Sequence, residues 1–213
     1  MSSEDKWDRF FDANRERKYE SVSGVGSSLL ATKEIREWIP VIVKRYDIRT
    51  VIDCPCGDFN WMKDISGIFD MYIGGDISNK VVDELRNINR KMHFFGQIDI
   101  VNDKLPSVDL ILTRDCFVHL PISKIKAAIK NIAASGSKFF LTTHYVEQNE
   151  HPLFKDMRNM DIGEGQWRPI NLSANPFNLG QPLEIIDEKD SSKYGYGKTL
   201  SLWSTEQLRQ VAE

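Results

Sequence analysis

The chain has 213 residues, of which 41% are hydrophobic and 28% are charged, a balance typical of a globular protein with one sizeable core. Its formal net charge is -3, so it has no global basic field, and we expect no nucleic-acid partner. No run of about 18 apolar residues occurs, which argues against a membrane-spanning helix. The three cysteines, Cys54, Cys56 and Cys116, lack the spacing of a zinc site, so we expect no metal and reduced thiols in the cytoplasm.

The N-terminal part of the chain is predicted to be helical. Charged and aromatic residues are interleaved over residues 4–20, which indicates an amphipathic helix. A loop rich in serine and glycine follows at 21–28. Thr32 is the expected N-cap of a second helix that runs to about Tyr46. Residues 1–48 are therefore expected to form a helical cover.

Short β-branched segments and helix-like stretches alternate through the middle of the chain. This alternation predicts right-handed crossovers and a mostly parallel, doubly wound, Rossmann-like sheet in a single α/β domain. The last two strand candidates are joined by a polar loop, which indicates a C-terminal antiparallel hairpin. The predicted strands are 50–53, 71–75, 91–98, 108–113, 138–143, 183–187 and 198–203, and the helix-like stretches between them are 60–66, 78–90 and 121–134.

Polar side chains stand at the ends of five successive predicted strands. Ligands of open α/β sheets bind at the carboxyl ends of the strands. One acid in such a place means little, but five polar groups at five successive ends favour a ligand site over a purely structural explanation. These residues are Asp53, Asp76, Asp99, Asp115 and His144.

The segment 51–58 has the pattern of a strand followed by a tight turn. Gly57 stands in this turn at a position where a side chain would collide with a ligand. A dinucleotide oxidoreductase needs three glycines here to bring a pyrophosphate to a helix N-terminus, and this loop has one. The loop therefore favours a ligand without a phosphate, with a structural strand-to-helix turn as the alternative.

This segment resembles motif I of class I methyltransferases that use S-adenosylmethionine, and Asp76 resembles their motif II acid. The stretches DCPCGDFNWM, RDCFVHLP and WRPINL with PFNL together look like a family of small bacterial and viral methyltransferases, some of them associated with glycan decoration. The resemblance covers roughly residues 20–203. It implies S-adenosylmethionine as the cofactor and O-methylation of a sugar hydroxyl as the reaction.

The resemblance also implies a cofactor site over the ends of the first three strands. Asp76 would accept hydrogen bonds from both ribose hydroxyls, with a helix N-cap as its alternative role. Asp99 would accept from the adenine amine, with a turn acid as the alternative. The loop at 21–28 would close over the amino-acid end of the cofactor. The cofactor-binding residues expected are Ser23, Gly24, Asp53, Pro55, Cys56, Gly57, Asp76, Ile77, Asp99, Ile100 and Arg114.

The candidate bases follow the fourth and fifth strands. In this fold the fourth strand faces the transferring methyl group, and Asp115 and His119 lie four residues apart just beyond it. If the chain turns helically there, both side chains share one face. A carboxylate next to an imidazole raises its basicity and fixes its tautomer. We expect His119 or Asp115 to be the base, with His144 in reserve. A packed, structural His119 is the alternative.

Residues 145–182 form a long and largely irregular segment, and loops of this length are usually functional. Trp167, Arg168 and Asn171 suit a polyhydroxylated acceptor, so a carbohydrate or another small molecule is expected, with an ordered cover over the core as the alternative. A methyltransferase of a non-sugar metabolite and a catalytically silent cofactor-binding module also remain possible. The expected division of the chain is 1–48 as cover, 49–144 as cofactor-binding core, 145–182 as acceptor loop and 183–203 as hairpin.

Overall fold

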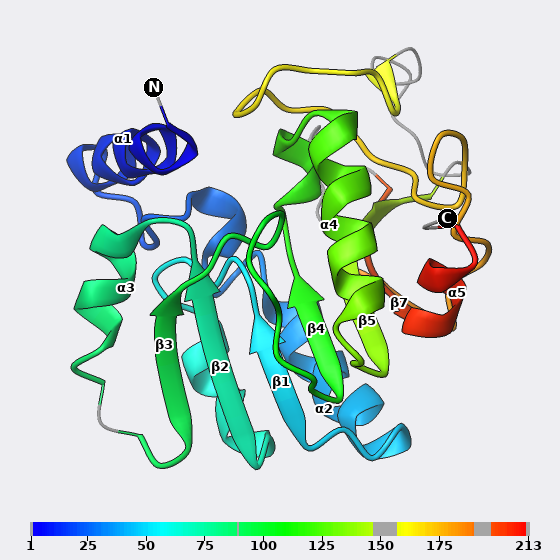
Figure 1. Ribbon diagram of the computed structural model, residues 1–213. Coiled ribbons are helices and arrows are strands. Elements are labelled where there is room, and N and C mark those ends of the chain that lie inside the picture. Colours follow the sequence, from blue (N-terminus) through cyan, green and yellow to red (C-terminus); the bar gives the residue numbers. More distant parts are fainter. Residues whose placement is uncertain (1, 89, 147–156, 190–196, 212–213) are drawn as a thin grey trace. The chain divides into compact units, whose positions relative to one another are not determined.

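The computed structural model describes residues 2–88, 90–146, 157–189 and 197–211 (Figure 1). The chain forms two compact units, residues 1–99 and residues 100–213. None of the described helices is long and apolar enough to cross a membrane.

The first unit contains a parallel sheet of three strands in the order β3-β2-β1. The strands are β1 (Thr50–Asp53), β2 (Met71–Asp76) and β3 (His93–Gln97). Asp53 pairs with Gly74, and Asp76 pairs with Gln97, so the last residues of β1 and β2 come to the same edge of this sheet. As expected for a parallel strand covered on both faces, β1 is buried from Val51 to its terminal acid.

The described residues of this unit form the α-helices α1 (Ser3–Glu16), α2 (Lys33–Arg45) and α3 (Asn79–Leu85). A capping box of Ser2 and Asp5 starts α1, and the Ser78 side chain caps α3. The buried face of α2 consists of Ile35, Ile39, Ile42 and Val43, as expected for an amphipathic helix on a sheet. Figure 1 shows α1 beyond the carboxyl ends of β2 and β3, next to α3.

Three local predictions for this unit are wrong. Thr32 makes no side-chain cap, because its backbone is not extended and its hydroxyl donates to the Ser28 carbonyl at 2.8 Å. The helix expected at 60–66 is replaced by two 3-10 turns, η2 (Met62–Asp64) and η3 (Ser66–Ile68). The helix expected at 78–90 ends at Leu85. A further 3-10 turn, η1, spans Val25–Ser27.

The second unit contains four strands in the order β4-β5-β7-β6. They are β4 (Leu110–Thr113), β5 (Phe139–Tyr145), β6 (Glu184–Asp187) and β7 (Lys198–Ser204). β4 and β5 are parallel, whereas β7 is antiparallel to both β5 and β6. The predicted fold class is therefore confirmed: a mostly parallel sheet with a C-terminal antiparallel hairpin. The division of the chain into functional segments stays a prediction.

The described residues of this unit also form the 3-10 turn η4 (Phe117–His119) and the helices α4 (Ile122–Ala134) and α5 (Thr205–Arg209). Figure 1 shows α4 along one face of β4 and β5, and α4 contacts α5. The sequence analysis did not predict α5, although Ser204 and Gln207 form a capping box at its start. The core of the unit is mostly apolar, and its largest fully buried apolar side chains are Leu110, Ile111, Leu112, Phe117, Phe140 and Trp203.

Candidate functional site

The backbone of the turn after β1 lies against Asp76, the acid that ends β2. Gly57 has φ +52°, and a Cβ placed on it would lie 2.0 Å from the Ser23 hydroxyl oxygen, so only glycine fits here without strain. The Gly57 N–H donates to the Asp76 carboxylate at 3.1 Å. Asp53 is buried and accepts from the Tyr72 hydroxyl at 2.7 Å. The turn and the two strand ends therefore form one hydrogen-bonded constellation.

Asp76 holds its charge in a buried position. Its side chain accepts backbone N–H groups from Gly57 on Oδ2 and from Ser78 on Oδ1. Burial raises the pKa of Asp76 to about 6, in opposition to the Ser78 and Gly57 N–H groups, which favour the anion. Each carboxylate oxygen can accept more than one hydrogen bond, so hydroxyl donors of a ligand can add to these backbone contacts.

The loop at 21–28 is tied to the same turn. Asp58 accepts from the Ser21 hydroxyl at 2.8 Å and from the Val22 N–H at 2.9 Å. The Asn60 amide donates to the Glu20 carboxylate at 2.8 Å and to the carbonyl of Ser27 at 3.1 Å. Ser23, which was expected at the cofactor, thus lies against Gly57, and neighbouring Gly24 takes a φ of +99° that glycine tolerates.

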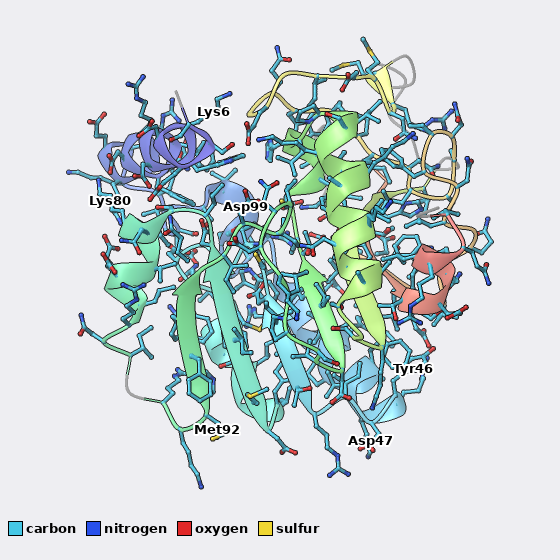
Figure 2. The ribbon with its side chains drawn as sticks, in the orientation of Figure 1. Lys6, Tyr46, Asp47, Lys80, Met92 and Asp99 are labelled. Atoms are coloured by element: carbon cyan, nitrogen blue, oxygen red, sulfur yellow. The ribbon has the colours of Figure 1, made fainter. Side chains whose placement is uncertain are left out.

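The remaining expected cofactor residues of this unit lie around the same strand ends. Cys56 is buried, and its N–H donates to the Gly75 carbonyl at 2.8 Å, while Pro55 is half-buried. The Ile77 carbonyl accepts from the Gln97 side chain at 2.9 Å. Asp99 is half-buried, and Figure 2 shows it beyond the carboxyl end of β3, with Met92 at the opposite end of that strand.

In the second unit, the end of β4 carries a buried network of four charged side chains. Arg114 contacts the carboxylates of Glu188 at 2.6 Å and Asp115 at 3.2 Å. Lys198 contacts Asp115 at 2.6 Å and Glu188 at 3.3 Å. The side chains of Arg114, Glu188 and Lys198 are at most 6% exposed, whereas Asp115 is 28% exposed. Asp115 is therefore the member that solvent or a ligand can reach.

The network fixes Asp115 as an anion. Burial acts to raise its pKa, but the Arg114 and Lys198 cations outweigh burial and hold the pKa of this carboxyl far below its usual value. Burial likewise opposes the charge of Arg114, while Asp115 and Glu188 raise its pKa overall. The Thr143 hydroxyl accepts the Asp115 N–H at 2.7 Å and donates to the carboxylate at 3.1 Å. Asp115 has φ +53°, a backbone strain of the kind found at functional sites.

His119 ends the 3-10 turn η4, and this turn does not extend back to Asp115. Its Nδ1 lies 2.9 Å from the Gln166 carbonyl oxygen, which only accepts, so Nδ1 carries the proton. In the neutral ring the lone pair is then on Nε2. Burial lowers the pKa of His119 below 6.5, although the Gln166 carbonyl and Asp115 act to raise it. The ring is thus a neutral proton acceptor near neutral pH.

His144 is arranged in the opposite way. Its Nδ1 accepts the Leu172 N–H at 3.2 Å, so the neutral ring carries its proton on Nε2. The ring is 3% exposed, packs edge-on against Trp203, and has a pKa lowered to about 4 by burial. With Nδ1 engaged and Nε2 protonated, the geometry favours a structural role for His144.

The expected acceptor residues differ in exposure. Trp167 is half-buried and packs edge-on against Tyr145, with the ring centres 6.1 Å apart. Arg168 is fully buried and donates to backbone carbonyls. Asn171 is 6% exposed and accepts the Ser173 N–H at 3.0 Å. Ile100 is buried as well. Residues 147–156 of the expected acceptor loop lie outside the described residues.

Sequence reasoning missed three residues that shape these sites. Glu188 and Lys198 are separated from their partners Arg114 and Asp115 by 74 and 83 positions, and no local pattern signals such pairs. Asp58 follows Gly57 directly, and its place in the motif I turn was a usable signal. Within the described parts of the chain, no three His, Cys, Asp or Glu side chains are gathered as metal ligands.

No family model matches the sequence, and no curated protein matches it. Solved structures do match. Magnesium protoporphyrin IX methyltransferase from Synechocystis PCC 6803, solved with bound SAM, superposes with a TM-score of 0.61 at 12% identity, covering 96% of this chain and 97% of that one. The N-methyltransferase NodS from Bradyrhizobium japonicum WM9 superposes with a TM-score of 0.61 at 8% identity. The match covers 84% of this chain and 98% of NodS. An S-adenosylmethionine-dependent methyltransferase from Clostridium acetobutylicum ATCC 824 superposes with a TM-score of 0.59 at 14% identity. The match covers 80% of this chain and 90% of that one.

The chain has a class I methyltransferase fold. At these identities the similarity establishes the methyltransferase fold alone, so the activity must be argued from the residues. In this fold the turn at Gly57 and the acid Asp76 stand at the ends of the first two strands, where the sequence analysis expected motifs I and II.

Proposed function

We propose that this protein is a methyltransferase that uses S-adenosylmethionine to methylate a hydroxyl group of a sugar in a glycan. The observation that carries the proposal is the constellation of Gly57, Asp76 and Asp53 at two neighbouring strand ends. Gly57 has no side chain, so a ligand can approach the backbone of this turn closely. The buried Asp76 next to it supplies a carboxylate that can bind hydroxyl groups.

The donor groups present fit this cofactor. Asp76 supplies an acceptor for the two ribose hydroxyls, and Asp99 supplies one for the adenine amine. The loop at 21–28, held by Asp58, supplies serine hydroxyls and backbone groups for the amino-acid end. When bound, the cofactor supplies a methyl group on a positively charged sulfonium. An acid directly against that charge would stabilise the ground state more than the transition state, so the acids serve recognition instead.

His119 is the better of the two candidate bases next to the fourth strand. Its Nδ1 is protonated and bound to a carbonyl, so Nε2 can take the proton of an acceptor hydroxyl as the methyl group is transferred. Asp115 is paired with two cations, which makes its carboxylate a weak base. As the exposed member of its network, Asp115 can instead accept a hydrogen bond from the acceptor and orient it.

The acceptor class rests on the aromatic and polar residues of the acceptor loop. The half-buried Trp167, edge-on to Tyr145, presents an aromatic surface of the kind that packs on the C–H groups of a sugar ring. A sugar hydroxyl is a poor nucleophile near neutral pH, which is why a positioned base is needed. The net charge of -3 argues against a nucleic-acid acceptor.

Cofactor binding is the first test. Titration calorimetry should show S-adenosylmethionine and S-adenosylhomocysteine binding in the micromolar range, about -8 kcal/mol. Asp76→Ala should weaken both, whereas Asp70→Ala, which removes an exposed acid just before β2, should not. No detectable heat with either ligand, or equal affinity in the Asp76 variant, contradicts the proposal.

Transfer is the second test. Radiolabel from the methyl group should enter a deoxysugar-containing glycan rather than RNA or DNA, and labelling of a small metabolite would redirect the acceptor assignment. His119→Ala should lower turnover by about 10² or more with little change in cofactor affinity. Asp115→Asn, which keeps shape and removes charge, should raise the acceptor KM. Cofactor binding without turnover on any acceptor would indicate a silent binding module.

A further inference from the structure

The turn that carries His119 is held along its whole length by a single short segment. Every carbonyl group of residues 117–120 accepts a hydrogen bond from residues 165–168. Two of these bonds come from the backbone N–H groups of Arg168, at 3.1 Å, and Gly165, at 2.9 Å. The other two come from the Arg168 guanidinium, at 2.6 and 2.7 Å. The accepting carbonyls belong to Phe117, Val118, His119 and Leu120.

The Arg168 side chain is the anchor of this contact. It is fully buried, and its Nε also donates to the Met160 carbonyl at 3.2 Å. Carbonyl groups at the end of a helical turn carry partial negative charge, and a charged donor strengthens each bond. Burial lowers the pKa of Arg168 to about 10, so the guanidinium is still charged near neutral pH. A guanidinium committed in this way to backbone carbonyls is not aimed at a substrate.

The same segment sets the state of the His119 ring. The Gln166 carbonyl accepts the Nδ1 proton, and the side-chain oxygen of Gln166 accepts the Gly163 N–H at 2.7 Å, which closes the segment on itself. Gly165, at φ +84°, lets the chain turn there. If the segment moved away, the ring would lose the Gln166 carbonyl as a partner and would become hydrated.

We propose that Arg168 is a positioning residue that clamps residues 163–168 onto the His119 turn, so that the Gln166 carbonyl holds His119 in the Nδ1–H form. The clamp explains why this arginine is buried against the carbonyls of Phe117, Val118 and Leu120 rather than exposed to an acceptor. The consequence for catalysis rests on the proposed function, in which Nε2 of His119 takes the acceptor proton. The tautomer of the ring does not depend on that function.

Charged groups on several elements bear on His119 and must be considered in any titration. Asp115 acts to raise its pKa, while Arg168 and Lys198 act to lower it. An ion pair of Lys124 and Glu164, at 2.9 Å, joins α4 to the clamping segment. Arg168→Lys keeps the positive charge but offers one compact donor group in place of the planar fork, so it tests the clamp without changing the local charge.

The experiment is heteronuclear NMR of the imidazole nitrogens over a pH titration, on the protein without ligand. In the wild type, His119 should show the Nδ1–H tautomer and a pKa below 6.5. In Arg168→Lys the tautomer should shift toward Nε2–H, which is the usual form in solution, and the pKa should rise. Gln166→Ala, an exposed substitution that removes only the bond to Gly163, should give a smaller shift. Arg209→Lys, which alters a similar bond to the Ala133 carbonyl, is the matched control.

The inference is overturned if wild-type His119 is the Nε2–H tautomer, or if folded Arg168→Lys keeps the wild-type tautomer and pKa. Should Arg168→Lys not fold, the wild-type tautomer and the Gln166→Ala shift decide the question. In turnover, Arg168→Lys should lower kcat by about 10- to 100-fold and move the acidic limb of the pH profile upward, with little change in cofactor affinity. If the NMR result holds and His119→Ala retains full turnover, the clamp stands and the assignment of the base fails.

Discussion

Asp76→Asn should change how the stability of the protein depends on pH. Burial raises the pKa of this carboxyl from 3.8 to about 6, a shift of about 2 units that corresponds to about 3 kcal/mol. Between these two values the folded state binds more protons than the unfolded state, so the free energy of unfolding falls as the pH rises. The ionised, buried carboxylate is therefore a cost to stability that is fully present above about pH 6 and is relieved in acid.

Integrated over the window from about pH 7 to about pH 4.5, this single group should add about 2 kcal/mol to the free energy of unfolding. Asparagine does not titrate, so the variant should lack that gain. Urea denaturation at both pH values measures it as the difference between wild type and Asp76→Asn, in which the contributions of all other groups cancel. Asp70→Asn is the control for the loss of one negative charge at an exposed position.

The same titration of Asp76 should also change cofactor affinity with pH. Because ribose hydroxyls donate to the charged carboxylate, cofactor affinity should decline below about pH 6 in the wild type, and Asp76→Asn should bind weakly at every pH. If the variant shows the same pH slope of stability as the wild type, Asp76 is not titrating in the buried state described here. Asp76 would then not bind ligand hydroxyls as a buried anion with a raised pKa.

Two further predictions concern the turn and the ion network. Gly57→Ala should weaken cofactor binding about tenfold or more, which is about 1.4 kcal/mol, because the new Cβ meets the Ser23 hydroxyl. A Cβ at Gly67 has no atom within 4 Å, so Gly67→Ala should leave the affinity measured by calorimetry unchanged. Arg114→Met should lower the free energy of unfolding by about 3–5 kcal/mol, because it leaves the buried Glu188 with one cation fewer. The double variant that also carries Glu188→Leu should recover most of that loss, as measured by urea denaturation. No recovery in the double variant would show that the charges of the pair do not account for the loss.

Strands β1 and β4 were predictable from the sequence because buried parallel strands appear as short, mostly apolar runs, and here each run ends in a polar residue. The hairpin was predictable because its two strand candidates are joined by a polar loop that contains glycine. The stretch at 60–66 failed because tertiary packing of Met62 and Ser66, both fully buried, selects two 3-10 turns over one continuous helix. The helix propensity of residues 60–66 contains no information about such tertiary packing.

The candidate site was predictable in its positions but not in its contacts. Acids at the ends of strands could be read from the chain, but Lys198, which pairs with Asp115, comes from the distant β7, and Glu188, which pairs with Arg114, follows β6. The assignment of Arg168 to the acceptor followed from its residue type, since a guanidinium next to an aromatic residue suits hydroxyl groups. Its burial against backbone carbonyls depends on how the chain returns to residues 117–120, which the sequence does not reveal.

The two strand-end acids, Asp76 and Asp115, show how one residue type is given two chemical roles. Backbone N–H groups alone compensate Asp76, so burial dominates and its pKa rises, which keeps it responsive to the hydroxyl donors of a ligand. Two cations compensate Asp115, so its pKa falls and it stays charged at any working pH. In the proposed reaction, a fixed anion that cannot easily take a proton leaves that task to a neutral imidazole, and His119 is held in the tautomer that has a lone pair on Nε2. The division of roles among these three residues follows from which partner each one has, because the partners decide which group can gain a proton near neutral pH.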